Sequence, residues 1–410
     1  MKTKLLENTV MLYIMKFGGY LFSFLIVPYQ TRVLSQDHYG ALSLALGMMM
    51  YFTMLIDYGF MVSGVTEVAE HRNDIVRLRE CITCVVIVRL FLSALSYVIL
   101  TVVVYSIEAY TPWSLVFYLY LAAVALEALL PTFFLRGVED MRTVALLTLF
   151  SKAIATMLVF VLVQNDADYF LVPVVRIIGA FLSLIIAWVY ISRKYQIKLV
   201  RVSFKQVLDR ARESFGYFVS RIASTVYRSG NTVILGMLYP TAVLALYSGP
   251  QKILDMGMGI SAPLSDSLLP HISKSHDYKS AWRIMELITP AILAGGIIGF
   301  IWAEPMVVWL FGEPYRESAS VLRAMIPVIA ITPYNHILAF PVLVPMGLRR
   351  YANMANVVGA VVWCGGMLML WSLGSLDILS AALLLGVTEL SVTLCRLTAV
   401  LANRNRLKVA

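Results

Sequence analysis

Charged side chains inside long apolar runs are the residues of this sequence most able to do chemistry. Eight of them are cations: Lys16, Arg89, Lys152, Arg176, Arg221, Arg228, Lys252 and Arg396. Five are acids: Asp57, Glu127, Asp255, Asp266 and Glu389. A charge at the centre of a bilayer costs roughly 2.5–3.5 kcal/mol on insertion scales, so such side chains usually face a cavity or one another. Because the acids are three too few to neutralise the cations, the excess predicts a cavity that binds an anion.

The positions of these cations predict which of them bind that anion. Arg221 and Arg228 are seven residues apart, which places them on one face of a helix, two turns apart. Lys16 shares a helix face with two tyrosines, and Lys152 and Lys252 fall near the middle of their apolar runs. We predict that these five cations line the cavity and bind the substrate.

Ion pairing and snorkelling are the alternative interpretations of the other charges. Lys252 and Asp255 are three residues apart, so we expect them to form an ion pair on one helix. Arg89, Arg176 and Arg396 each lie within about two turns of the end of their apolar run. Long side chains in such positions reach the membrane interface, and we interpret these three arginines in that way.

The remaining motifs favour structural roles. Cys81 and Cys84 form a C-x-x-C, but no second pair or histidine cluster accompanies it, so we expect helix packing and no metal site. Gly295 and Gly299 form a G-x-x-x-G suited to close helix packing. His336 is able to relay protons, although a packed histidine is the simpler interpretation. The sequence has no P-loop and no H-E-x-x-H, so we do not expect an enzyme, and no catalytic residue is assigned.

Composition predicts the elements that must position these charges. Of 410 residues, 60% are hydrophobic and only 14% are charged, so most of the protein surface must face lipid. A helix needs about 20 apolar residues to cross a bilayer. This length predicts an all-α, polytopic membrane protein with about twelve transmembrane helices, near 8–29, 40–61, 81–105, 113–135, 143–163, 170–192, 215–238, 242–268, 283–304, 323–345, 353–373 and 378–401.

The distribution of Lys and Arg predicts the orientation of these helices. With the N-terminus inside, the inner segments hold 22 of these cations, whereas the outer segments hold only Arg32 and Arg316, with Arg323 at a helix edge. By the positive-inside rule both termini are cytoplasmic. The net charge of +9 is then explained by short loops, without a nucleic-acid partner.

One long polar segment divides the chain. In residues 193–214, RKYQIKLVRVSFKQVLDRARES, Ser203 is suited to cap a short amphipathic helix lying on the inner leaflet. The alternative is an ordinary solvated linker. We predict a six-helix lobe at 1–192, the linker at 193–214 and a second six-helix lobe at 215–410, with the cationic cavity between the lobes.

The chain resembles the polysaccharide flippases of the multidrug/oligosaccharidyl-lipid/polysaccharide exporter superfamily, especially the Wzx-type O-antigen group. Besides the twelve spans in two halves, the resemblance is carried by the strings VLSQDHYGALSLA, AVLALYSGPQKIL and FGEPYRESASVL. It implies a flippase in the bacterial inner membrane that serves lipopolysaccharide biosynthesis. The implied substrate is an oligosaccharide joined by diphosphate to undecaprenyl lipid, moved from the inner to the outer leaflet by alternating access.

The resemblance also implies accessory components of transport. A gradient of H+ or Na+ would drive the cycle, which requires a titratable acid, and Asp57, Glu127 and Asp255 are the candidates. No cofactor is implied. Membrane lipid, a polysaccharide polymerase and a chain-length regulator are the implied partners.

Two other functions compete with this one. A drug/cation antiporter of the same superfamily would need an anionic cavity, and the excess of cations disfavours it. A membrane-embedded polysaccharide polymerase would need catalytic residues in large aqueous loops. The longest outer segment, around 304–322, is too short for such a site.

Overall fold

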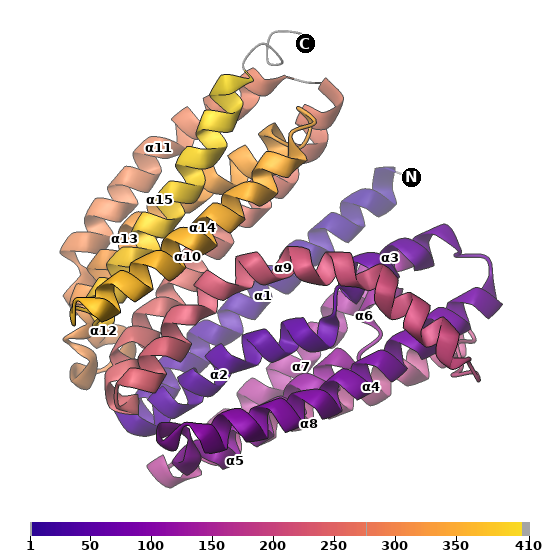
Figure 1. Cartoon of the computed structure of the whole chain (residues 1–410), viewed down its shortest axis with the longest axis horizontal. Coiled ribbons are helices and arrows are strands. Elements are labelled where there is room, and N and C mark those ends of the chain that lie inside the picture. Colours follow the sequence, from indigo (N-terminus) through magenta and orange to yellow (C-terminus); the bar gives the residue numbers. More distant parts are fainter. Residues whose placement is uncertain (1, 276, 404–410) are drawn as a thin grey trace. The chain divides into compact units, whose positions relative to one another are not determined.

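The computed structural model describes residues 2–275 and 277–403, except for some side chains in the helices α1, α9 and α10. Every regular element in these residues is a helix (Figure 1). Contacts between residues divide the chain into two compact units, Met1–Thr225 and Val226–Ala410, and each is described here by itself.

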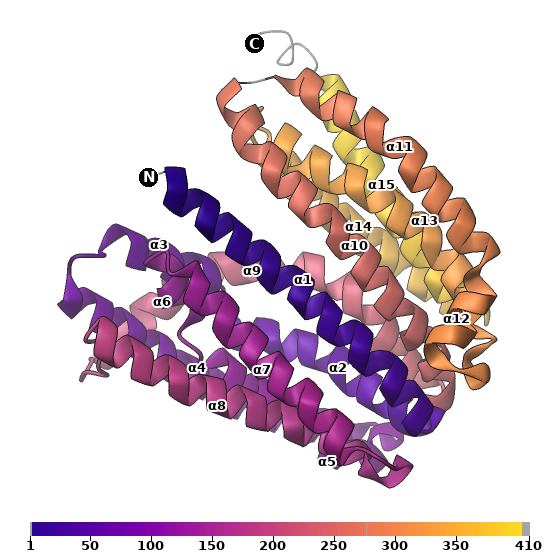
Figure 2. The same cartoon turned by 180° about the vertical axis from the view of Figure 1, so that it is seen from behind.

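The first unit is a bundle in which α1 lies along α7, and α7 packs against α8 (Figure 2). Polar side chains begin several of its helices, since Ser35, Asp74 and Asp140 each accept a hydrogen bond from a backbone N–H of the first turn. Its elements are α1 (Lys2–Val33), α2 (Gln36–Asp57), α3 (Phe60–Glu70), α4 (Ile75–Ser106), η1 (Glu108–Trp113), α5 (Ser114–Ala128), α6 (Thr132–Gly137), α7 (Met141–Leu162), η2 (Asp166–Phe170), α8 (Leu171–Lys194) and the first part of α9 (Phe204–Leu238).

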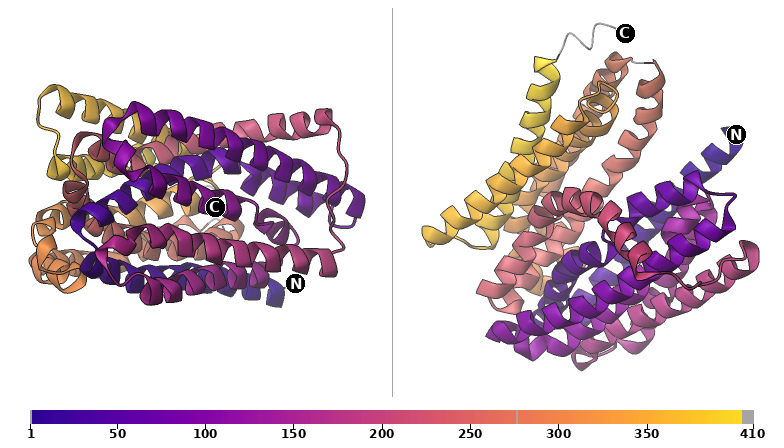
Figure 3. Two further views of the ribbon diagram at one scale, coloured as in Figure 1. Left: turned by 90° about the horizontal axis from the view of Figure 1, so that it is seen from below. Right: turned by 45° about the vertical axis from the view of Figure 1, so that its right-hand side comes forward.

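In the second unit the long helices run roughly alongside one another (Figure 3). Its most extensive helix–helix contacts join α13 to α10 and α15, and α14 to α15. The elements that follow α9 are α10 (Thr241–Ser275), α11 (Tyr278–Ile301), α12 (Ala303–Phe311), η3 (Glu313–Tyr315), α13 (Ser318–Ile337), the π-helical turn η4 (Leu338–Val342), α14 (Arg349–Ser372) and α15 (Ile378–Ala402).

Nine helical segments within the described residues are long and apolar enough to cross a membrane. They coincide with nine of the twelve predicted spans, which confirms a multi-pass, all-helical protein. The other three predicted spans, 8–29, 215–238 and 242–268, fall in α1, α9 and α10, the helices whose side chains are only partly described. The total of twelve and its division into two six-helix lobes stay predictions.

The helix predicted within the linker begins where expected but is not a separate element. Ser203 accepts a hydrogen bond from the N–H of Gln206, whose side chain accepts one from the N–H of Ser203. This reciprocal cap starts α9 at Phe204. The helix then continues without a break through Leu238, so it joins the linker directly to the predicted seventh span.

The predicted close packing at Gly295 and Gly299 is wrong. A β-carbon on Gly295 would meet nothing within 4 Å, and one on Gly299 would only touch Ile326 at 3.5 Å. These glycines instead line a largely apolar groove of about 430 Å³ formed by α10, α11, α12 and α13. Because these glycines have no side chains and no neighbouring helix approaches the backbone at Gly295, open space remains beside α11.

Candidate functional site

Two cations and one acid lie together in the first unit, on helices α5, α7 and α8. Arg176 on α8 donates from Nε and Nη2 to the two carboxylate oxygens of Glu127 on α5, both at 2.8 Å. About a third of each side chain is exposed, 32% for Arg176 and 36% for Glu127. The guanidinium also lies over the ring of Tyr120, 5.9 Å from its centre. Arg176 therefore does not snorkel away from the protein, and that interpretation is wrong.

Lys152 of α7 adds the second positive charge. It is exposed, and it lies close enough to interact electrostatically with both Arg176 and Glu127. Among the described residues no hydrogen bond or ion pair to its ammonium is found. The ammonium lies 2.7 Å from the position of a β-carbon on Gly19, so a glycine in α1 makes room for it. Lys16, which is half-buried, precedes Gly19 by about one helical turn.

The cluster of Lys152, Arg176 and Glu127 carries one net positive charge. Glu127 occupies one edge of the Arg176 guanidinium, whereas the ammonium of Lys152 has three donors available for an incoming group. Arg and Lys donors form their strongest hydrogen bonds with anionic oxygens such as those of phosphate. The arrangement is suited to bind an anion at a partly exposed surface within the membrane-spanning part of the unit.

Arg89 and Asp57 form a second charged pair that is fully internal. Their residues are 3% and 8% exposed, and Arg89 Nη2 donates to Asp57 Oδ1 at 2.9 Å. Arg89 also donates to the carbonyl of Ala128 and lies between the rings of Phe60 and Phe133. Snorkelling by Arg89 is therefore a wrong prediction, since its charge is held between α2, α4 and α5.

The second unit holds a buried polar network around Asn335 of α13. Arg396 of α15, which is 6% exposed, donates to the carbonyl and side-chain oxygens of Asn335. It also donates to the carbonyl of Ala352 and to Asn356 Oδ1 on α14. Asn335 Nδ2 in turn donates to Glu389 Oε2 at 2.7 Å. The snorkelling predicted for Arg396 is thus wrong as well. Glu389 belongs to the same buried network, which its position in an apolar run did not predict.

The other predicted site residues stay predictions. The side chains of Arg221 and Arg228 lie outside the described residues. Lys252 is half-buried and Asp255 is exposed on α10, and the ion pairs of the described residues do not include the one predicted between them. The cavity predicted between two lobes stays a prediction, because the two units are described separately.

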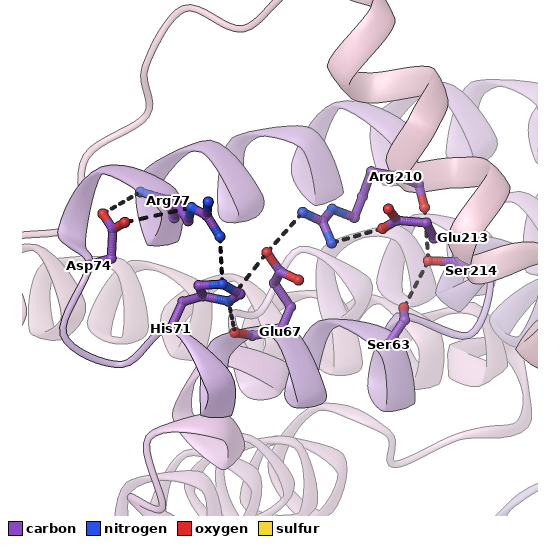
Figure 4. Close-up of polar contacts among 8 residues, drawn as sticks. All are labelled: Ser63, Glu67, His71, Asp74, Arg77, Arg210, Glu213 and Ser214. Carbon is purple, nitrogen blue, oxygen red and sulfur yellow. Dashed lines mark hydrogen bonds and ion pairs between the residues drawn. The ribbon is translucent and has the colours of Figure 1, made fainter.

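A polar network joins α3, the start of α4 and the start of α9 (Figure 4). Arg210 donates to Glu67 at 3.1 Å and to Glu213 at 3.0 Å. Burial alone would lower the pKa of Arg210, but the hydrogen bond to Glu67 and the charges of the groups around it together outweigh burial and raise the pKa. The side chains of Glu67, Glu70 and His71 approach one another closely enough to hold a metal. Because Glu67 is already paired with Arg210, the network favours a structural tie over a metal site.

The C-x-x-C motif lies in the wall of a polar pocket beside this network. The pocket has a volume of about 260 Å³, and Cys81 and Cys84 are both buried in its lining with Glu67, Glu80 and Arg210. Cys81 and Cys84 both face this pocket because residues three apart lie on the same side of a helix.

The fold is one that occurs in membrane transporters of known structure. The structure is similar to an inward-facing multidrug resistance MATE family transporter of the MOP superfamily, with a TM-score of 0.73, 13% identity and coverage of 95% of this chain and 94% of the other. It is also similar to the lipid II flippase MurJ in an inward closed conformation, with a TM-score of 0.77, 10% identity and coverage of 96% and 87%.

The sequence identifies the family to which the chain belongs. Residues 5–276 match the family described as polysaccharide biosynthesis protein, and the chain belongs to that family. A candidate O-antigen transporter of Shigella dysenteriae is 23% identical over 87% of this chain and 90% of the relative. Another from Escherichia coli (strain K12) is 21% identical over 96% and 95%. The resemblance predicted from the sequence is confirmed.

Proposed function

We propose that this protein is a flippase that moves an undecaprenyl-diphosphate-linked oligosaccharide from the inner to the outer leaflet of the bacterial inner membrane. The observation that carries the proposal is the cluster of Lys152, Arg176 and Glu127, in which positive charge exceeds negative charge within the membrane-spanning part. A diphosphate needs charge-assisted partners before it leaves water, and Lys and Arg supply them. The names of the curated relatives, O-antigen transporters, support this substrate class.

The cycle that we propose is alternating access. Two halves of the chain expose the cationic residues first to the inner side and then to the outer side. The sugar passes through the aqueous interior, and the apolar tail stays in lipid between helices. A gradient of H+ or Na+ drives the cycle, both termini face the cytoplasm, and a polymerase with a chain-length regulator uses the product.

A drug/cation antiporter is the second candidate, because the fold is shared with a multidrug transporter. A site for cationic drugs requires excess negative charge, and the described cluster has the opposite sign. The similarity in fold is therefore compatible with both substrates, while the charge of the cluster favours the anionic one.

Complementation of a deletion strain tests the proposed function. The strain should accumulate single lipid-linked repeat units on the inner leaflet, and the intact gene should restore surface polysaccharide. Lys152→Glu should fail to restore it at normal protein level, whereas Lys279→Glu, at an exposed position of α11, should succeed. Accumulation on the outer leaflet would instead indicate a polymerase, and full restoration by Lys152→Glu would contradict the assignment of the site.

Charge reversal at two further predicted cations extends this test. Arg228→Glu and Lys252→Glu should each abolish surface polysaccharide while the protein level is maintained. Normal surface polysaccharide in both variants would remove these residues from the substrate site without affecting the evidence from Lys152.

A further inference from the structure

Glu389 is a buried acid near the middle of α15 with one carboxylate oxygen left unsatisfied. The residue is only 1% exposed. Its Oε2 accepts a hydrogen bond from Asn335 Nδ2 at 2.7 Å, but its buried Oε1 has no hydrogen-bond partner among the described residues. A buried polar atom without a partner is costly, so such an atom in a native structure requires an explanation.

The other buried or partly buried acids at membrane depth differ from Glu389 in one respect. Asp57 accepts directly from Arg89 at 2.9 Å, and Glu127 accepts two hydrogen bonds from Arg176. Addition of a proton to either carboxylate would weaken an ion pair. Addition of a proton to Glu389 Oε1 would break no hydrogen bond formed by the described residues. Among these three described acids, Glu389 is therefore the one that could gain and lose a proton without dismantling its surroundings.

Protonation of Glu389 would affect Arg396 through the side-chain amide of Asn335, which is hydrogen-bonded to both. Arg396 follows Glu389 by seven residues on α15, about two turns along the same face. Asn335 donates to Glu389 through Nδ2 and accepts from Arg396 through Oδ1, so its amide lies between the acid and the cation. Arg396 also donates to neutral oxygens of Asn335, Ala352 and Asn356.

Few other described groups near this network titrate or carry charge. His336 on α13 follows Asn335, but its Nδ1 shares a hydrogen bond with Ser261 of α10 at 2.9 Å. α10 also contributes the hydroxyl of Ser265, which donates to the carbonyl of His336. On α14, Arg349 and Arg350 are exposed at the first turn. Among the described residues, no acid of α10, α13, α14 or η4 forms a hydrogen bond or ion pair with Glu389.

We propose that Glu389 binds the proton whose movement drives transport, an inference that rests on the proposed flippase function. A proton from the outer side adds to Oε1 and converts the carboxylate to a neutral carboxylic acid. The acid then no longer balances the charge of Arg396 across Asn335, which changes how strongly α15 is held to α13 and α14. Release of the same proton to the inner side restores the carboxylate and resets the unit.

Transport in vesicles under an imposed pH gradient tests this proposal. The full chain is reconstituted with a labelled lipid-linked oligosaccharide, and the rate is measured with and without an inward proton gradient. Wild type should be stimulated several-fold by the gradient. Glu389→Gln, which cannot release a proton, should lose the stimulation, whereas Glu389→Asp should keep part of it. Glu286→Gln removes an exposed acid of α11 in the same unit and should respond like wild type.

A spectroscopic measurement separates failure of this proposal from failure of the proposed function. The infrared difference spectrum between acidic and neutral pH should contain a protonated-carboxyl band that Glu389→Gln removes and Glu286→Gln retains. This readout does not depend on transport, so it tests the proton site even if no flipping is found or Glu389→Gln impairs the cycle. The proposal is overturned if Glu389→Gln keeps the full stimulation, if the band persists in it, or if only a sodium gradient stimulates wild type.

Discussion

The ammonium nitrogen of Lys152 lies 2.7 Å from the position that a β-carbon would occupy on Gly19. A glycine in one membrane-spanning helix thus admits the charged end of a side chain from another. The contact explains how a lysine near the middle of α7 keeps its ammonium beside α1 instead of reaching toward a membrane surface. The contact also makes the position of Lys152, a predicted substrate-binding residue, depend on the absence of a side chain at Gly19.

Replacement of that glycine should displace the cation. In Gly19→Ala the added methyl group would occupy the space of the Lys152 ammonium, which lies at the end of a flexible chain and is able to move. We expect flipping to fall on the order of tenfold, or about 1.4 kcal/mol, with little loss of protein. Gly216→Ala is the control, because a β-carbon there would meet nothing within 4 Å. Equal activity of both variants would show that the position of Lys152 does not matter.

The pair of Arg89 and Asp57 should behave as a structural ion pair. Removal of one partner from a buried pair costs roughly 3–5 kcal/mol, since the other charge is left uncompensated. Arg89→Met should therefore lower the thermal unfolding midpoint in detergent strongly. The double variant Arg89→Met with Asp57→Leu should recover most of the loss. If the double variant is less stable than Arg89→Met alone, Asp57 has favourable contacts beyond this pair.

Two adjacent glycines of α14 give a matched test of packing in the second unit. A β-carbon on Gly366 would lie 2.2 Å from Leu384 of α15, whereas one on Gly365 would meet nothing within 4 Å. Overpacking of this kind typically costs about 1–3 kcal/mol, so Gly366→Ala should unfold at a lower temperature than wild type. Gly365→Ala should match wild type or exceed it slightly, because alanine favours helix. A reversed order of the two midpoints would contradict the packing of α14 on α15.

Asp140, between α6 and α7, should contribute to stability in a pH-dependent way. Burial alone would raise the pKa of its carboxyl, but hydrogen bonds from Tyr190, Lys194, Thr143 and Tyr195 outweigh it and hold the pKa well below its usual range. A lowered folded-state pKa stabilises the protein above the unfolded-state value, about 3.9, and this stabilisation is lost as the pH falls toward the folded-state value.

The corresponding measurement compares wild type with Asp140→Asn. Their difference in unfolding midpoint should be constant from neutral pH down to about 4 and should close below that value, because the wild-type carboxylate becomes protonated. A difference that narrows between about pH 7 and pH 5 would indicate that another group titrates in its place.

The helices were predictable from the sequence, while the partners of the buried charges were not. Long apolar runs set the nine described spans, because length and hydropathy alone decide whether a helix crosses a bilayer. Position within a run, by contrast, says nothing about neighbours. Arg89, Arg176 and Arg396 lie near the ends of their apolar runs and therefore resembled snorkelling residues, yet all three have partners on other helices.

The spacing of residues on a single helix was equally insufficient to predict which charges pair. Lys252 and Asp255 have the separation of an ion pair, but that pair is not among those of the described residues. Glu389 stood out only as one more acid in an apolar run, because its unsatisfied oxygen depends on what α13 places opposite it. The excess of positive charge in the sequence therefore predicts an anionic substrate, whereas the contacts between helices determine which residues lie together.

The most direct test of the central claim is flipping of a labelled undecaprenyl-diphosphate-linked oligosaccharide by the purified chain in vesicles. Vesicles with the wild-type protein should expose the label on the opposite leaflet far faster than protein-free vesicles. Lys152→Gln should slow this by roughly ten- to a hundredfold, the loss expected for one charge-assisted hydrogen bond of about 1.5–3 kcal/mol. A wild-type rate equal to that of protein-free vesicles would contradict the account.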